Sequence, residues 1–170
     1  MHYIKSPHLF NDSPRPWLFL AGSVGKGSGG TWRGRVIAAL AKANFSGSVL
    51  NPAIEFWEHS GEPADREPGR TERIGWELSA LEQADRLLMH FSSESESPIT
   101  LLELGLAAST QRVVVSCEPR FWKRDNVLAV CKRYVIPVIA RLEDFTEHVP
   151  GLSAKGDSPS GPSHDKRSHL

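Results

Sequence analysis

One carboxylate stands out in this chain because of the residues around it. Glu103 lies in the segment 97–108, which is otherwise apolar or small. The serine that begins this segment and the proline after it are typical of the first turn of a helix. A carboxylate in such surroundings can serve as a nucleophile or as a proton donor and acceptor. The alternative is an ordinary solvated stripe, because Thr100, Glu103 and Thr110 share one helical face.

Three further polar residues, Asp85, Ser97 and Asn126, complete the candidate site. Ligands of parallel α/β sheets gather at the carboxyl ends of the strands, beside the loops there. Ser97 opens the helix after the third predicted strand, so its hydroxyl is expected at that edge. Glu103 follows about one and a half helical turns later, close enough to reach the same place.

A glycine-rich loop, residues 22–30, follows the first predicted strand and precedes a helix. Its glycines Gly25, Gly27 and Gly30 match the phosphate-binding pattern G-x-G-x-x-G. Three residues separate the strand from the first of these glycines, and no acidic residue lies about 20 positions on to hold a ribose. The P-loop pattern also fails, since Lys26 is followed by glycine. We interpret the loop as a cover over the sheet edge that contacts a sugar or phosphate through Gly22 and Ser23. A dinucleotide-dependent redox enzyme is the alternative.

Apolar runs alternate with helical patterns and predict one α/β domain. Strands are expected at 17–21, 48–50, 86–91, 112–117 and 135–138, with helices between them. This alternation favours a parallel five-stranded sheet with helices on both faces. Residues 1–15 are interpreted as an N-terminal arm and residues 16–150 as the domain. Residues 151–170, half of them glycine, serine or proline, are expected to be a disordered tail.

The polar connection 53–70 is longer than the loops that normally join two elements of a compact domain, so it is expected to be functional. Trp57 within it is the best candidate for stacking on a ligand. His90 lies in an apolar strand and is interpreted as a core histidine. Cys117, Cys131 and the seven histidines show no metal-ligand spacing, so neither a metal nor a cofactor is predicted.

The charges balance, with 20 Lys and Arg against 20 Asp and Glu. A neutral chain provides no field that favours nucleic acid or a membrane surface, so the expected partner is a small molecule or a protein. Two cysteines make no disulfide framework, and no apolar run is long enough to span a bilayer. We therefore expect a soluble, cytoplasmic protein.

Four segments together resemble the nucleoside 2-deoxyribosyltransferase family, in its divergent "like" branch. They are Phe-Leu-Ala-Gly-Ser at 19–23, Asn-Pro at 51–52, Trp-Glu-Leu at 76–78 with Ala-Asp at 84–85, and Ser-Pro-Ile-Thr-Leu-Leu-Glu-Leu-Gly at 97–105. The resemblance covers about residues 17–140. It implies a single flavodoxin-like, Rossmann-like domain with a five-stranded sheet.

The resemblance also implies a reaction. Glu103 would attack the anomeric carbon of a nucleoside or nucleotide, and a second base or water would then take the sugar. Asp85 would orient the leaving base and the nucleophile, or act as an acid. Asn126 would bind the sugar's 5-hydroxyl in a neighbouring subunit's site, which implies a homo-oligomer.

Three residues depart from the pattern of typical transferases. Ser97 replaces an aspartate and is similar to the serine that serves the phosphate in deoxynucleoside 5-monophosphate N-glycosidases. Phe19 replaces a tyrosine whose hydroxyl would steady the glutamate, and Ala53 replaces the arginine usual after Asn-Pro in the divergent branch. Phe19 and Ala53 favour the alternative that this chain is a nucleoside- or nucleotide-binding module with lost or weak catalysis.

Overall fold

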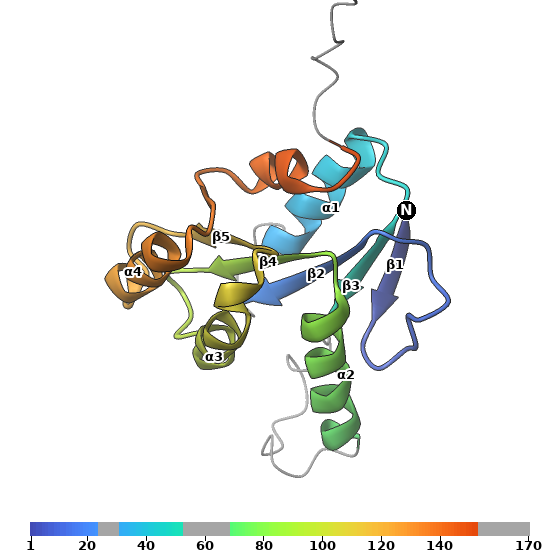
Figure 1. Cartoon of the computed structure of the whole chain (residues 1–170), viewed down its shortest axis with the longest axis horizontal. Coiled ribbons are helices and arrows are strands. Elements are labelled where there is room, and N and C mark those ends of the chain that lie inside the picture. Colours follow the sequence, from blue (N-terminus) through green and yellow to red (C-terminus); the bar gives the residue numbers. More distant parts are fainter. Residues whose placement is uncertain (24–30, 53–68, 153–170) are drawn as a thin grey trace, which may run out of the picture.

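The computed structural model describes residues 1–23, 31–52 and 69–152 (Figure 1). Six parallel strands form one sheet in the order β1-β3-β2-β4-β5-β6. The strands are β1 (His2–Lys5), β2 (Trp17–Gly22), β3 (Ser48–Asn51), β4 (Arg86–Phe91), β5 (Val113–Cys117) and β6 (Val138–Ile139). The helices are α1 (Trp32–Lys42), α2 (Arg70–Gln83), α3 (Pro98–Ala107) and α4 (Arg124–Tyr134), with short 3-10 helices η3 (Ala108–Thr110) and η4 (Leu142–His148). None of the described helices is both long and apolar enough to cross a membrane.

The α/β class and the flavodoxin-like arrangement predicted from the sequence are confirmed, but the sheet has six strands and not five. Without β1, the order β3-β2-β4-β5-β6 is the flavodoxin-like order 2-1-3-4-5. The extra strand comes from the segment interpreted as an arm: β1 pairs with β3, placing Tyr3 beside Val49. Its side chains are exposed or half-buried, so it lacks the apolar run that marks the central strands.

Helices cover both faces of the sheet (Figure 1). Alternate residues of a strand point to opposite faces. Leu18 and Leu20 of β2 therefore pack in the core beneath α1 and η4, whereas Phe19 packs in the core beneath α2, α3 and α4. All three side chains are fully buried, as predicted for a central strand.

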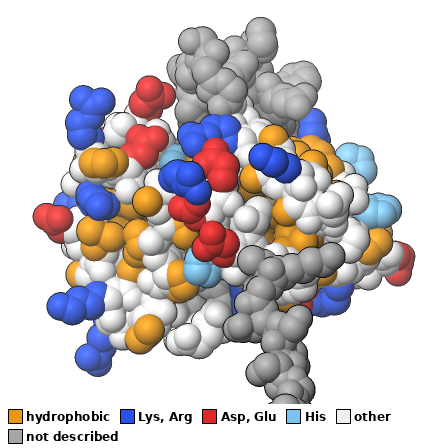
Figure 2. All heavy atoms as spheres, turned by 90° about the horizontal axis from the view of Figure 1, so that it is seen from above, with side chains coloured by type: hydrophobic (Ala, Val, Ile, Leu, Met, Phe, Trp, Pro, Cys, Tyr) orange, Lys and Arg blue, Asp and Glu red, His pale blue; other side chains and the backbone are white. Residues whose placement is uncertain are grey.

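The face formed by α1 and η4 is shown in Figure 2, where acidic and basic side chains lie intermixed. Two ion pairs explain part of this pattern. Arg35 of α1 pairs with Glu143 of η4 at 2.9 Å, and Arg141 pairs with Asp144 at 2.7 Å. The first pair joins η4 to α1 across the surface of the domain.

Candidate active site

The candidate site lies where the strand order reverses. The chain leaves β2 through α1 toward β3 on one side, and it leaves β4 through α3 toward β5 on the other. At such a switch point, doubly wound sheets bind ligands in a crevice at the carboxyl ends of the strands, here β2 and β4. Ser23 follows β2, and residues 92–97 follow β4, so both segments border it.

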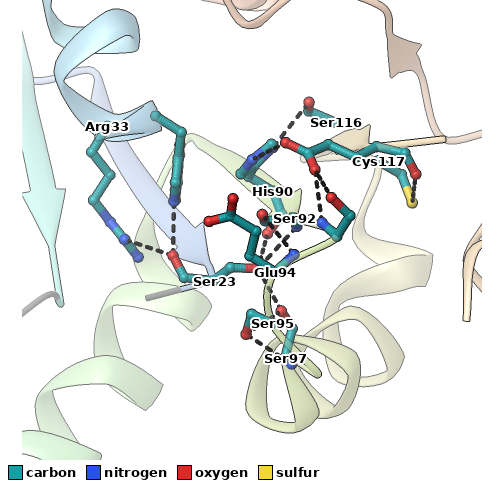
Figure 3. Close-up of polar contacts among 12 residues, drawn as sticks. Ser23, Arg33, His90, Ser92, Glu94, Ser95, Ser97, Ser116 and Cys117 are labelled. Carbon is teal, nitrogen blue, oxygen red and sulfur yellow. Dashed lines mark hydrogen bonds and ion pairs between the residues drawn. The ribbon is translucent and has the colours of Figure 1, made fainter. Parts of the chain in front are cut away.

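Serine hydroxyls join these two segments (Figure 3). The hydroxyl oxygens of Ser23 and Ser97 share a hydrogen bond of 2.5 Å. The backbone N–H of Ser92 donates to the Ser23 hydroxyl at 3.0 Å, and the Ser97 hydroxyl donates to that of Ser95 at 3.2 Å. Ser23 and Ser97 are both buried. The cluster thus fixes the start of α3 against the end of β2.

Ser97 does not cap α3 in the way the sequence predicted. Its backbone is left-handed, with φ of 48°, and its side chain makes no capping hydrogen bond. The hydroxyl is turned to Ser23 and Ser95 instead. The predicted proline at the first helical position is confirmed by Pro98.

Gly22, a predicted substrate contact, has a packing reason to be glycine. A Cβ atom there would lie 2.6 Å from the carbonyl oxygen of His90 and 2.9 Å from the Trp32 ring, and the backbone has φ of +148°. Both the space and the backbone conformation therefore exclude a larger residue. The backbone N–H of Ser23 donates to the same His90 carbonyl at 3.1 Å.

Arg33 reaches this edge from α1. Its side chain is buried. The guanidinium donates to the carbonyl oxygens of Leu20, Gly22 and Ser23 at 3.1 to 3.3 Å. Burial lowers its pKa to about 10, so the group stays cationic at neutral pH. Main-chain oxygens at the end of β2 thus hold a fixed positive charge beside the crevice.

Glu103 points inward from α3. It is only 8% exposed, and Thr100 beside it is 4% exposed, so the alternative of a solvated stripe is wrong. Burial, and after it the charge of Glu77, raise the pKa of Glu103 to about 7, and the charge of Arg33 opposes the shift. Within the described residues no hydrogen bond or ion pair holds its carboxylate. A buried, unrestrained carboxylate that ionises near neutral pH can act as a nucleophile.

Glu77 is the second carboxylate of the site, and the sequence analysis missed it. It lies on α2, half-buried, and burial raises its pKa while Arg73 and Arg33 lower it. Its charge contributes to raising the pKa of Glu103, and the helices that carry the two residues, α2 and α3, contact each other. The sequence did offer a signal, since Glu77 stands in the Trp-Glu-Leu segment 76–78, one of the segments that carry the resemblance.

Asp85 does not join this site. It precedes β4, and its carboxylate accepts from the backbone N–H of Trp17 at 2.6 Å and from Arg15 at 2.7 Å. Both partners are at or before the start of β2. Because β4 has six residues, each adding about 3.3 Å, Asp85 lies at the opposite edge of the sheet from Ser92. The expectation that Asp85 acts beside Glu103 is therefore wrong; it holds the amino ends of two strands.

The structure does not place the other predicted substrate contacts beside Glu103. Asn126 is exposed on the first turn of α4, which follows β5. Trp57 and the motif glycines of the 22–30 loop lie outside the described residues.

His90 is the core histidine that the sequence predicted. It is buried, its Nδ1 lies 3.1 Å from the Ser116 hydroxyl, and its Nε2 lies 3.9 Å from a carboxylate oxygen of Glu118. Burial lowers its pKa to about 4, so the ring is neutral at pH 7. Glu118 also accepts from the backbone and hydroxyl of Ser93 at 2.7 Å, which ties the loop before α3 to β5. Among the described residues no group of three or more His, Cys, Asp or Glu could hold a metal ion.

Comparison with known proteins agrees with the fold. A family model described as nucleoside 2-deoxyribosyltransferase like matches residues 15–121, more than half of the chain. The match runs from the start of β2 past β5 and includes Glu77, Ser97 and Glu103. No curated protein matches the chain. The chain belongs to the nucleoside 2-deoxyribosyltransferase-like family.

Proposed function

We propose that this chain breaks the N-glycosidic bond of deoxynucleosides, nucleosides or their phosphates, with Glu103 as the nucleophile. The observation that carries this proposal is the burial of Glu103 on α3, beside Glu77 and at the carboxyl edge of β2 and β4. The family supports glycosyl transfer on nucleosides as the reaction class.

The reaction has two steps. A carboxylate oxygen of Glu103 attacks the anomeric carbon, the bond from that carbon to the base nitrogen breaks, and the base leaves with the electron pair and takes up a proton. The covalent glycosyl-enzyme is then attacked by a second base or by water, which releases the carboxylate. Both steps pass through an oxocarbenium-like state that an adjacent carboxylate stabilises.

Glu77 is the group we assign to proton transfer. Burial raises the pKa of both carboxyls, and the charge of Glu77 also raises that of Glu103, so the two do not both ionise easily and at neutral pH one of them holds a proton. With Glu103 ionised for attack, Glu77 carries that proton and can donate it to the departing base. Arg33 stabilises the ionised state of Glu103 through its fixed charge.

The hydroxyls of Ser23 and Ser97 are the groups we assign to the far end of the sugar. They lie at the amino end of α3, where the free backbone N–H groups of the helix favour an anion. This combination suits a 5-phosphate better than it suits a bare hydroxyl. Asn126, exposed on α4, remains our candidate for a contact to the sugar in a neighbouring subunit's site.

A binding module without catalysis is the second candidate, and one observation favours it. Phe19 is fully buried and provides no hydroxyl, so no described side chain orients the Glu103 carboxylate. Such a protein would bind nucleosides or nucleotides and release no base.

The test is the release or exchange of base from a panel of deoxynucleosides and ribonucleosides, each with and without a 5-phosphate, followed by chromatography. We expect release from at least one member, and a loss of at least about 1,000-fold in Glu103→Ala. Glu96→Ala, which removes an exposed carboxylate just before α3, is the matched control and should keep the wild-type rate. Binding in a thermal-shift assay with no release from any substrate would support the binding module and reject the enzyme.

A further inference from the structure

An aromatic cluster joins the segment between β1 and β2 to α2, which lies beside it (Figure 1). Phe10 is 3% exposed, and its ring meets those of Trp17 and Trp76 edge to face, with ring centroids 5.0 and 5.6 Å apart. The indole N–H of Trp76 donates to the carbonyl oxygen of His8 at 2.7 Å. Glu77, the proposed proton donor, is the next residue of α2. From these contacts we infer that Phe10 and the main chain beside it are positioning groups for Glu77, acting through Trp76.

Trp76 determines how α2 is rotated about its own axis. Among the described side chains of this helix, the buried ones are Trp76, Ala80 and Leu81, and the last two lie in its final turn. Gly69, just before the helix, provides no side-chain cap. Trp76 is thus the first buried anchor along the helix. Successive helical residues are turned by about 100° from each other, so holding the indole also sets the direction of Glu77.

The segment that holds Trp76 is itself anchored on both sides. Before it, β1 pairs with β3, and the backbone N–H of Ser6 donates to the carbonyl oxygen of Asn51 at 3.1 Å. After it, the indole N–H of Trp17 donates to the carbonyl oxygen of Ser13 at 3.1 Å. The backbone N–H of Ser13 donates in turn to the carbonyl oxygen of Phe10 at 2.9 Å. A segment tied down in this way presents the Phe10 ring at a fixed place, as a loose terminal arm does not.

Phe19 packs on the same indole from the sheet. Its ring is fully buried and lies 6.4 Å from that of Trp76, at an angle of 61°. Trp76 therefore has aromatic contacts with a central strand and with the segment before it. The match to the family model begins at residue 15, so it includes Trp76 and Phe19 and leaves out Phe10. A role for Phe10 does not follow from family membership.

The role proposed for Glu77 requires an exact position. A proton donor must lie within about 2.6 to 3.2 Å of the atom that takes the proton, and a displacement of about 1 Å can cost about 100-fold in rate. The charges of Arg73 and Arg33 oppose the effect of burial on the pKa of Glu77, and its own charge acts on Glu103. A rotated α2 would change all of these distances. This step rests on the proposed function, which gives Glu77 a proton to transfer.

The titration of Glu103, followed by carboxyl-carbon NMR of the full chain without substrate, tests the inference. Phe10→Leu keeps an apolar side chain but removes the ring edge that meets Trp76. We expect it to lower the pKa of Glu103 by at least about 0.5, because a displaced Glu77 no longer raises that pKa as much. Phe45→Leu is the matched control, since Phe45 is 4% exposed in the core on the other face of the sheet, and should leave this pKa unchanged. An unchanged or higher pKa in Phe10→Leu would overturn the inference.

A double-mutant cycle shows whether Phe10 acts through Glu77. In the Glu77→Gln background, Phe10→Leu should not lower the pKa of Glu103 any further. A second fall of the same size there would contradict the inference, because Phe10 would then act on Glu103 by another route. Trp76→Phe is a milder variant for the case in which Phe10→Leu does not fold. It keeps a ring and removes the N–H donated to His8, and we expect a fall in the pKa of Glu103 here too.

The rate separates positioning from a loss of stability. Circular dichroism melting gives, for each variant, the temperature range in which it is folded. Within that range we expect kcat of Phe10→Leu to fall about tenfold with KM within about threefold, whereas Phe45→Leu keeps both values. A wild-type kcat in Phe10→Leu would overturn the inference. If the wild type releases no base from any substrate, the proposed function fails, and the titration of Glu103 still decides whether Phe10 positions Glu77.

Discussion

The hydroxyl oxygens of Ser23 and Ser97 lie 2.5 Å apart and join the end of β2 to the residue that begins α3. Ser23 is held in turn by the backbone N–H of Ser92, so one hydroxyl links both sides of the crevice. Glu103 lies on the helix that starts at this link. The position of the proposed nucleophile therefore depends on a contact between two small side chains at the sheet edge.

Ser97→Ala should change substrate preference more than stability. The variant removes a hydroxyl from the proposed phosphate end, while Ser23 keeps its contact with Ser92. We expect kcat/KM for 5-phosphorylated substrates to fall at least tenfold more than kcat/KM for the unphosphorylated ones. Ser109→Ala, at an exposed serine in η3, is the control. An equal fall for both substrate classes would contradict a phosphate at Ser97.

Glu103→Gln should stabilise the folded protein at neutral and alkaline pH. The folded pKa of about 7 lies above the ordinary value of 4.5 for a glutamate, so the folded state holds the proton more tightly than the unfolded chain does. The protein therefore loses stability as pH rises from 4.5 through 7. The amide cannot ionise and escapes this loss. We expect a gain of about 3 kcal/mol in urea unfolding at pH 8, at about 1.4 kcal/mol per pKa unit, and none near pH 4.

Glu96→Gln, on the exposed residue just before Ser97, is the control for this measurement and should leave the pH dependence unchanged. A Glu103→Gln variant with the same pH dependence as wild type would show that Glu103 ionises as in the unfolded chain.

Glu77→Gln should move the pH profile of activity. The nucleophile must be ionised, so the rate rises with pH around the pKa of Glu103, and the charge of Glu77 contributes to raising that pKa. Removing this charge should shift the acidic limb of kcat/KM to lower pH and also reduce the maximal rate, since the proposed proton donor is lost. Glu82→Gln, exposed on the same helix, should leave the limb in place. A shift to higher pH would contradict the proposed coupling of the two carboxylates.

Asp85→Ala should affect folding and not the chemical step. Without the carboxylate, the backbone N–H of Trp17 and the Arg15 side chain lose their acceptor. We expect a loss of about 1 to 3 kcal/mol in urea unfolding. Below the melting transition, kcat should remain within about threefold of wild type. A loss of 100-fold or more in kcat with unchanged stability would restore a catalytic role for Asp85.

Much of the fold could be predicted because its core strands are long apolar runs. The segment around Leu18 and Phe19 is buried on both faces, and such a segment is recognisable without any partner. β1 was not predictable in this way, since its side chains are exposed or half-buried and it is placed by its backbone pairing with β3 and by Ile4, which packs partly against the core.

The site was predictable only where chain order fixes it. Ser97 and Glu103 follow β4 directly, so their place at the carboxyl edge could be inferred from the strand alone. Glu77 and Arg33 approach the edge from α2 and α1, and their closeness to Glu103 depends on how those helices pack. Asp85 directly precedes β4, which places it at the amino edge of the sheet; it was misplaced because its role was carried over from the family resemblance and not from the strand order.

Covalent trapping tests the role of Glu103 most directly. The protein is incubated with a 2-fluoro-2-deoxynucleoside, whose electron-withdrawing fluorine slows breakdown of the glycosyl-enzyme, and is then analysed by intact mass spectrometry and peptide mapping. We predict a mass increase of one fluorinated sugar, located on Glu103 and absent from Glu103→Ala. An adduct on another residue, or base release from natural substrates by Glu103→Ala at the wild-type rate, would contradict Glu103 as the nucleophile.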